Sequence, residues 1–213
     1  GSWNTSSVTT MKGMFWNGAN QFNNGGNSSI GNWDTSSVTD FSYMFANAGS
    51  FNQDIGNWDV SAATDMNVMF NNASSFNQNI QIGSNATNLY QMFVRAYSYT
   101  GVGVENWDVS GTMNIAYFAY IASSFNGNIE NWDVSQKTSL LYFAYNAASL
   151  NRSLHNWNTS SVTDARNAFN LTALTRLPTN WTSCTLFNNA FTNIDTNSQS
   201  LNSDAAGLQL ASS

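Results

Sequence analysis

Apolar residues recur along the chain in a fixed order, which is clearest in the segment that begins at Thr64. A Thr-Asp pair is followed by Met66, Met69 and Phe70. Positions i, i+3 and i+4 share one face of a helix, Thr64 is a favourable N-cap, and Asp65 would stand at the positive end of the helix dipole. The spacing predicts a short helix with one buried face.

The rest of the unit has a different pattern. Residues 51–55, Phe-Asn-Gln-Asp-Ile, are too few for a helix and predict a short strand. Residues 57–61, Asn-Trp-Asp-Val-Ser, predict a turn, because Asn, Asp and Ser side chains bond to nearby backbone groups. The Trp of this turn recurs with the buried period and is predicted to lie in the core, with a row of sugar-stacking rings as the alternative.

The unit occurs eight times. A Phe closes each copy, at spacings of 22 to 30 residues: Phe15, Phe45, Phe70, Phe93, Phe118, Phe143, Phe169 and Phe191. One unit cannot bury its apolar face, whereas stacked units can. We therefore predict an α/β repeat, a solenoid of about eight coils, each a short parallel strand plus a short helix. Residues 1–191 are assigned to these repeats, of about 25 residues each, and 192–213 to a C-terminal tail, a cap or the start of a following segment.

Two strings carry a resemblance to a known family. Asn-Trp-Asp-Val-Ser and Thr-Asp-Met-x-x-Met-Phe resemble the repeats of BspA-type leucine-rich-repeat surface proteins. The resemblance covers residues 1 to about 191, is most specific over 32–79, and loosens over 81–101, where Ile82 replaces the Trp. It implies a leucine-rich-repeat-like solenoid displayed outside the cell, on a cell surface or a viral particle, with a role in adhesion. It carries over no catalytic residue.

Charge and composition narrow the function. The net charge is −6 with only six Lys and Arg, so the chain has too few cations for a nucleic-acid binder or a polybasic membrane patch. The longest apolar run, Ile115–Ala122, is far too short to span a membrane, so no membrane insertion is expected. Aromatic residues make up 14% of the chain, which is enough to build a core. The chain also begins in mid-pattern at Trp3-Asn4, which favours a piece of a longer array.

Catalytic and metal-binding chemistry has little material. His155 and Cys184 are the single residues of their kinds, so we expect no enzyme, no cofactor, no internal disulfide and no His/Cys metal cluster. A row of acidic residues follows the Trp of the turn: Asp34, Asp59, Asp108 and Asp133. These carboxylates are predicted to cap their turns, because Asn stands in the same place at Asn4 and Asn158. Bridging Ca²⁺ ions are the alternative.

Binding residues are expected where the repeats differ, since packing fixes the core positions. Two residues after the Phe, the row includes Arg95, Tyr120 and Tyr145, residue types enriched at binding hot spots. The predicted strand offers a second, more hydrophilic set: Gln53, Asp54, Gln78, Asn79, Asn128 and Arg152.

Two functions follow from this interpretation. The first is an extracellular binding or adhesion module that contacts a protein or a glycan, with host recognition on a viral particle as one form of it. The second is a structural spacer in a fibre or particle, which assembles with neighbouring subunits through the ends of the solenoid.

Overall fold

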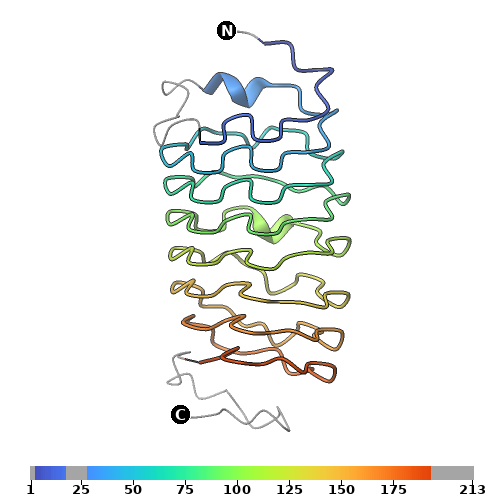
Figure 1. Ribbon diagram of the computed structural model, residues 1–213, viewed down its shortest axis with the longest axis vertical. Coiled ribbons are helices and arrows are strands. Elements are labelled where there is room, and N and C mark those ends of the chain that lie inside the picture. Colours follow the sequence, from blue (N-terminus) through green and yellow to red (C-terminus); the bar gives the residue numbers. More distant parts are fainter. Residues whose placement is uncertain (1–2, 18–27, 193–213) are drawn as a thin grey trace.

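The computed structural model describes residues 3–17 and 28–192. Its repeats are stacked one above another in chain order along a single long axis (Figure 1). Apart from Thr192, the predicted C-terminal segment 192–213 lies outside the described residues.

The predicted composition of each coil is wrong. Within the described ranges the helices are two 3-10 helices, η2 (Ser28–Asn32) and η3 (Val104–Asn106), and neither an α-helix nor a strand occurs. Pairing between coils takes the form of isolated parallel bridges: Thr10 with Asp40, Asp40 with Asp65, Asp65 with Asn88, Asn88 with Asn114, Ser139 with Asp164, Ser153 with Arg176, and Asp164 with Leu186. The α/β, leucine-rich-repeat-like coil of a parallel strand plus a helix is therefore replaced by a coil of turns.

The predicted helix is instead a segment whose backbone bonds alternate between two partners. We call it the bridge segment; in the second coil it covers residues 39–47. The N–H groups of Phe41, Tyr43 and Phe45 donate to carbonyls of the next coil at 2.9–3.0 Å. Between them, the N–H of Met44 donates to the carbonyl of Phe41 in its own coil at 3.1 Å. The same alternation recurs in the other coils and ties each to its neighbour.

The predicted N-cap threonine also serves the stack. The N–H of Thr64 donates to the carbonyl of Thr39 at 2.9 Å, and its hydroxyl donates to the same carbonyl at 3.2 Å. Thr64 therefore joins two coils and begins no helix.

Alternating turns force part of each bridge segment into the left-handed region. Tyr43 and Asn47 have φ values of 60° and 62°, and the following coils repeat the pair four residues apart. Asparagine tolerates this conformation, whereas the β-branched Val68 and Ile121, both at 58°, are strained. Three asparagines of this row also form a side-chain ladder, in which Asn47 Nδ2 donates to Asn17 Oδ1 at 2.7 Å and Asn72 Nδ2 to Asn47 Oδ1 at 3.1 Å.

Stacked aromatic rings fill the centre of the coils. The rings of Phe45 and Phe70 lie 5.6 Å apart, and Phe45 also stacks on Phe51 at 3.8 Å, which brings the bridge segment and residues 51–55 together across the core. Trp58 is buried, and its indole N–H donates to the carbonyl of Ile30 in the preceding coil at 2.8 Å. The Trp row from Trp58 onward is thus part of the core, as the sequence indicated.

The register shifts by one residue in the fifth and sixth coils. Phe70 N–H donates to the carbonyl of Met92, but Phe93 N–H donates to that of Phe118, so Phe118 occupies the place of Met92. Ala119 then takes the anchor position, and its N–H donates to Phe143 in the sixth coil. The assignment of Phe118 and Phe143 as equivalents of Phe93 is therefore wrong, although both rings remain buried.

The left-handed conformation of Asn47 provides a direct test of this architecture. Asn47→Ala is expected to lower the free energy of unfolding by about 2 kcal/mol, because Ala is strained there and both amide bonds are lost. Asn47→Gly is expected to cost only about 1 kcal/mol, since Gly adopts positive φ without strain. Urea denaturation of the two variants measures the difference, and equal losses would contradict a left-handed constraint at this position.

Candidate functional site

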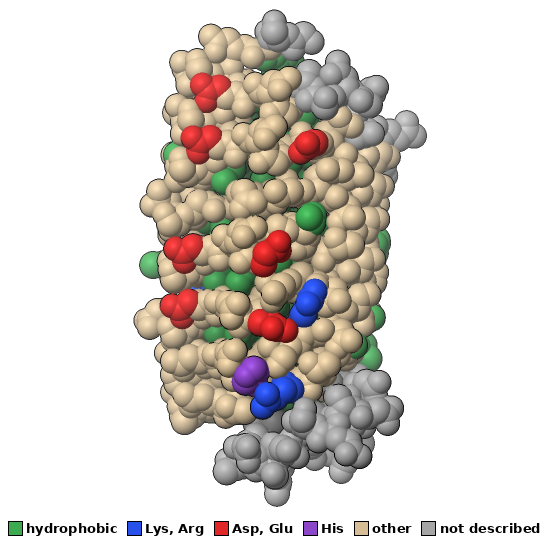
Figure 2. Space-filling model, turned by 180° about the vertical axis from the view of Figure 1, so that it is seen from behind, with side chains coloured by type: hydrophobic (Ala, Val, Ile, Leu, Met, Phe, Trp, Pro, Cys, Tyr) green, Lys and Arg blue, Asp and Glu red, His purple; other side chains and the backbone are tan. Residues whose placement is uncertain are grey.

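The aspartate row caps turns. Asp59 Oδ1 accepts the N–H of Ser61 at 3.0 Å, and Asp133 Oδ1 accepts that of Ser135 at 2.9 Å. Asn4 makes the same bond to the N–H of Ser6 at 3.2 Å, so the turn does not require a charge. Figure 2 shows acidic side chains in a column along one edge of the molecule. Within the described ranges, no group of three or more His, Cys, Asp and Glu could hold a metal ion.

These hydrogen bonds set the acidity of the row. Hydrogen bonds donated to the four carboxylates lower their pKa, first those from the side chains and then those from the backbone N–H groups of Ser36, Ser61, Ser110 and Ser135. The four members are Asp34, Asp59, Asp108 and Asp133. The ionised form is therefore the one that the folded turns favour.

Tyr120 and Tyr145 lie together on the outer side of the bridge segments. Their rings are stacked at 5.2 Å with an interplanar angle of 17°. Both are half-buried. Among the described residues, neither hydroxyl has a hydrogen-bond partner.

Three more tyrosines join this pair. Tyr117 stacks on Tyr142 at 4.9 Å, Tyr142 meets the edge of Tyr120 at 5.6 Å, and Tyr90 meets Tyr117 at 5.8 Å. We call the five the tyrosine patch: Tyr90, Tyr117, Tyr120, Tyr142 and Tyr145. Burial within this cluster raises the pKa of Tyr117, and the neighbouring tyrosines add to the effect.

Sequence reasoning missed Tyr90, Tyr117 and Tyr142. With Phe118 and Phe143 taken as equivalents of Phe93, Tyr117 and Tyr142 would stand at the buried position of Met92, but the one-residue shift moves both to the left-handed, half-exposed position of Tyr43. In the sixth coil the spacing contained a signal for this shift, because Thr138 stands five residues before Phe143, against six from Thr64 to Phe70; in the fifth coil Thr112 stands six residues before Phe118 and gave none.

Basic side chains flank the patch. Arg95, predicted to share a row with Tyr120, lies one position further along; it is exposed, and its N–H donates to the Tyr120 carbonyl at 2.9 Å. On the other side, Arg166 pairs with Asp164 at 2.8 Å, a contact that raises the pKa of the guanidinium. Tyr117 and Tyr142 are close enough to Arg166 to add to that rise.

The structure separates the second predicted set. Gln53 is buried, with 8% of its surface exposed, which does not suit a contact residue. Asp54 accepts the N–H of Gly56 at 2.9 Å, Gln78 donates to Asn52, and Asn79 accepts from Gln81 at 3.0 Å. The two remaining residues, Asn128 and Arg152, line one open groove.

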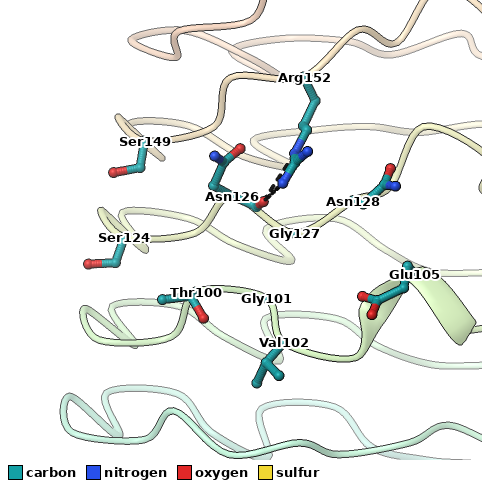
Figure 3. A pocket seen from close by; sticks show the side chains of 10 residues that line it. All are labelled: Thr100, Gly101, Val102, Glu105, Ser124, Asn126, Gly127, Asn128, Ser149 and Arg152. Atoms are coloured by element: carbon teal, nitrogen blue, oxygen red, sulfur yellow. Dashed lines mark hydrogen bonds between the residues drawn. The ribbon is translucent and has the colours of Figure 1, made fainter.

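This groove has a volume of about 680 Å³ and crosses the fourth to sixth coils (Figure 3). Its lining is Thr100, Gly101, Val102, Glu105, Ser124, Asn126, Gly127, Asn128, Ser149 and Arg152. The Arg152 guanidinium donates to the carbonyl of Asn126 at 2.7 and 3.1 Å, which fixes it at one end. Glu105 was not singled out in the sequence, because it lies in the η3 irregularity rather than in the regular row.

One family model matches the chain. It is described as "Mycoplasma protein of unknown function, DUF285", and it matches residues 1–100 and again 87–204. These two matches agree with a repeat protein. Comparison with curated proteins and with solved structures finds no match. No helix in the described ranges has the length and apolarity needed to cross a membrane.

The capped turns predict an acid-labile fold. A carboxylate whose folded pKa is lowered contributes stability that is present above its unfolded value, about 3.9, and is lost as the pH falls through the folded pKa. The melting temperature is therefore expected to fall as the pH is lowered below about 4, more shallowly for Asp59→Asn, which keeps the acceptor. Millimolar Ca²⁺ at neutral pH is expected to leave the melting temperature unchanged. A rise in the melting temperature on adding Ca²⁺ would favour bridging cations.

Proposed function

The chain belongs to the DUF285 family, whose description assigns no role, and we propose that it is a non-enzymatic binding module that contacts a protein through the tyrosine patch. One observation carries this proposal: five half-buried tyrosines are in mutual contact on one surface, and of their hydroxyls only that of Tyr90 has a hydrogen-bond partner among the described residues. Tyr and Arg are enriched among the residues that dominate binding energy, and here Arg95 and Arg166 flank the tyrosines.

The ring geometry supports a protein rather than a sugar as the partner. A sugar ring stacks on the open face of an aromatic ring. In the patch, Tyr120 covers a face of Tyr145, and Tyr117 covers a face of Tyr142. Each of these rings therefore offers a partner at most one open face, together with its edge and its hydroxyl, and edges and hydroxyls suit hydrogen bonding and close packing against a protein surface.

The proposal includes display outside the cell and a BspA-type role in adhesion. The resemblance of the Asn-Trp-Asp-Val-Ser and Thr-Asp-Met-x-x-Met-Phe strings to BspA-type surface proteins supports it, whereas the family match supports the repeat character alone. The surroundings of His155 support the non-enzymatic part. Its Nδ1 lies 2.8 Å from Ser153 Oγ, but the nearby Glu130 carboxylate accepts the N–H of Ser153 rather than a proton of the imidazole. A Ser-His pair oriented by a carboxylate is thus not formed here.

Removing two hydroxyls tests the patch. The double variant Tyr120→Phe/Tyr145→Phe keeps the stacked rings, so its melting temperature is expected to stay close to that of the unchanged protein. Surface plasmon resonance against a panel of purified extracellular proteins is expected to find a binder, and the double variant should weaken that binding at least tenfold. Serine is unsuitable at these positions, because the rings are half-buried and their loss would also remove packing.

A matched control comes from tyrosines outside the patch. Tyr43→Phe/Tyr97→Phe removes the same two groups from a half-buried and an exposed position and is expected to bind like the unchanged protein. Absence of any binder in the panel, or equal effects of the two double variants, would contradict a contact surface at the tyrosine patch.

The structural spacer is the second candidate, and the first coil favours it. Trp3, Met14 and Trp16 are exposed there by 60%, 39% and 53%. In the second coil the carbonyls of Ser42 and Met44 accept N–H groups from the coil before it. The equivalent carbonyls of Lys12 and Met14 have no such partner among the described residues. An unpaired edge with exposed apolar side chains suits contact with a further coil, either one that precedes it in a longer chain or one of a neighbouring subunit.

Sedimentation over a range of concentrations tests the spacer. If the first coil mediates assembly, the protein is expected to associate, and Trp3→Ser/Met14→Ser should weaken the association at least tenfold. Met113→Ser, at a mid-stack residue that is 80% exposed, is the control and should have no effect. A protein that stays monomeric throughout would contradict assembly through this end.

A further inference from the structure

We propose that the groove across the fourth to sixth coils is a second binding site, specific for a neutral saccharide and separate from the tyrosine patch. The patch lies on the bridge segments, whereas the groove lies on the coil segments equivalent to residues 51–55, on the other side of the aromatic core.

Two successive coils lack a side chain at one position of the repeat that lines the groove. The row reads Gln53, Gln78, Gly101, Gly127 and Arg152. A Cβ added to Gly101 would lie 2.5 Å from the Cα of Gly127, closer than any side chain tolerates, and Gly101 has a φ of 86°. The backbones of the two coils therefore approach directly, and their glycines form a bare floor where other coils carry Gln or Arg.

Polar groups of every kind surround this floor. Figure 3 shows the hydroxyl residues Thr100, Ser124 and Ser149 on one side of the two glycines, and Glu105 and Asn128 on the other. Carboxylate and amide oxygens accept hydrogen bonds, whereas amide nitrogens and the guanidinium of Arg152 donate them. A sugar hydroxyl both donates and accepts, so a ligand with several hydroxyls can use this mixed lining. Val102, 43% exposed, offers one apolar contact for the C–H groups of a sugar.

Other ligand classes fit the groove poorly. An anion would meet the Glu105 carboxylate, whose like charge disfavours it. A metal ion would find one carboxylate, and the described residues contain no cluster of ligating groups. A peptide that docks by its side chains needs apolar pockets, but Val102 is the single exposed apolar side chain in the lining.

The size of the groove agrees with a small saccharide. Its volume of about 680 Å³ falls within the range of ligand sites, about 300–1,000 Å³. Because the groove is open along its length, a ligand buries little of its surface, and we expect dissociation constants on the order of 1 mM.

Saturation-transfer NMR on the whole chain suits this affinity. The probes are neutral trisaccharides of glucose, galactose, mannose and N-acetylglucosamine, with sialyllactose as the anionic comparison. At least one neutral probe is expected to bind, and Glu105→Ala/Asn128→Ala should raise its dissociation constant at least tenfold. Both side chains are exposed, and the one turn bond that is lost, from the N–H of Glu130 to Asn128 Oδ1 at 3.3 Å, is long, so the melting temperature should change little.

Two controls separate this site from the other surfaces. Asp54→Ala removes an exposed carboxylate from the same side of the second coil and should leave saccharide binding unchanged. Tyr120→Phe/Tyr145→Phe should also leave it unchanged, so the saccharide site stands or falls independently of the tyrosine patch. The proposal is overturned if no neutral probe binds, if only sialyllactose binds, or if the groove variant binds like the control.

Discussion

The alternation of backbone hydrogen bonds in the bridge segments is the constraint on which the rest of the structure depends. Every second N–H leaves its coil for the next one, as at Phe41 and Tyr43, and the N–H groups between them close turns within the coil, as at Met44. The backbone N–H groups of a strand donate to neighbouring strands, whereas those of a helix donate to carbonyls within the same helix. The bridge segment does both, so cohesion along the stack requires neither element. The cost is a left-handed residue at two places in each coil.

This constraint decides which side chains reach the surface. A shift of one residue along the bridge segment exchanges positions, and the fifth and sixth coils make this shift: Phe118 fills the place of Met92, and Ala119 the place of Phe93. Because Ala119 has no ring, Phe118 supplies the buried aromatic ring of this segment. Tyr117 and Tyr120 then lie on the outer side. The tyrosine patch is therefore a consequence of register as well as of composition.

The sequence predicted the period and the core correctly but not the local structure. Phe70 and Trp58 are buried, as their recurrence indicated. The helix was wrong because apolar residues at i, i+3 and i+4 also arise from alternating turns, in which Met66, Met69 and Phe70 point inward without helical bonds. Periodicity alone does not distinguish the two, since the difference lies in positive φ values that no residue type here signals except asparagine. For the same reason the predicted binding row combined Arg95 with tyrosines from another position.

The departures from the regular repeat coincide in the middle coils. The left-handed row is Asn at Asn47 and Asn72, where the amide ladder offsets the strain, and changes to Arg95 and then Ile121. A β-branched residue at a φ of 58° is unfavourable by roughly 1–2 kcal/mol and makes no ladder bond. The tyrosine patch begins in these same coils, and on the other side of the core Gly101 and Gly127 open the groove. Ile121 thus combines the strain that Val68 also carries with the loss of the ladder bond, and it does so in the coils that hold the two unusual surfaces.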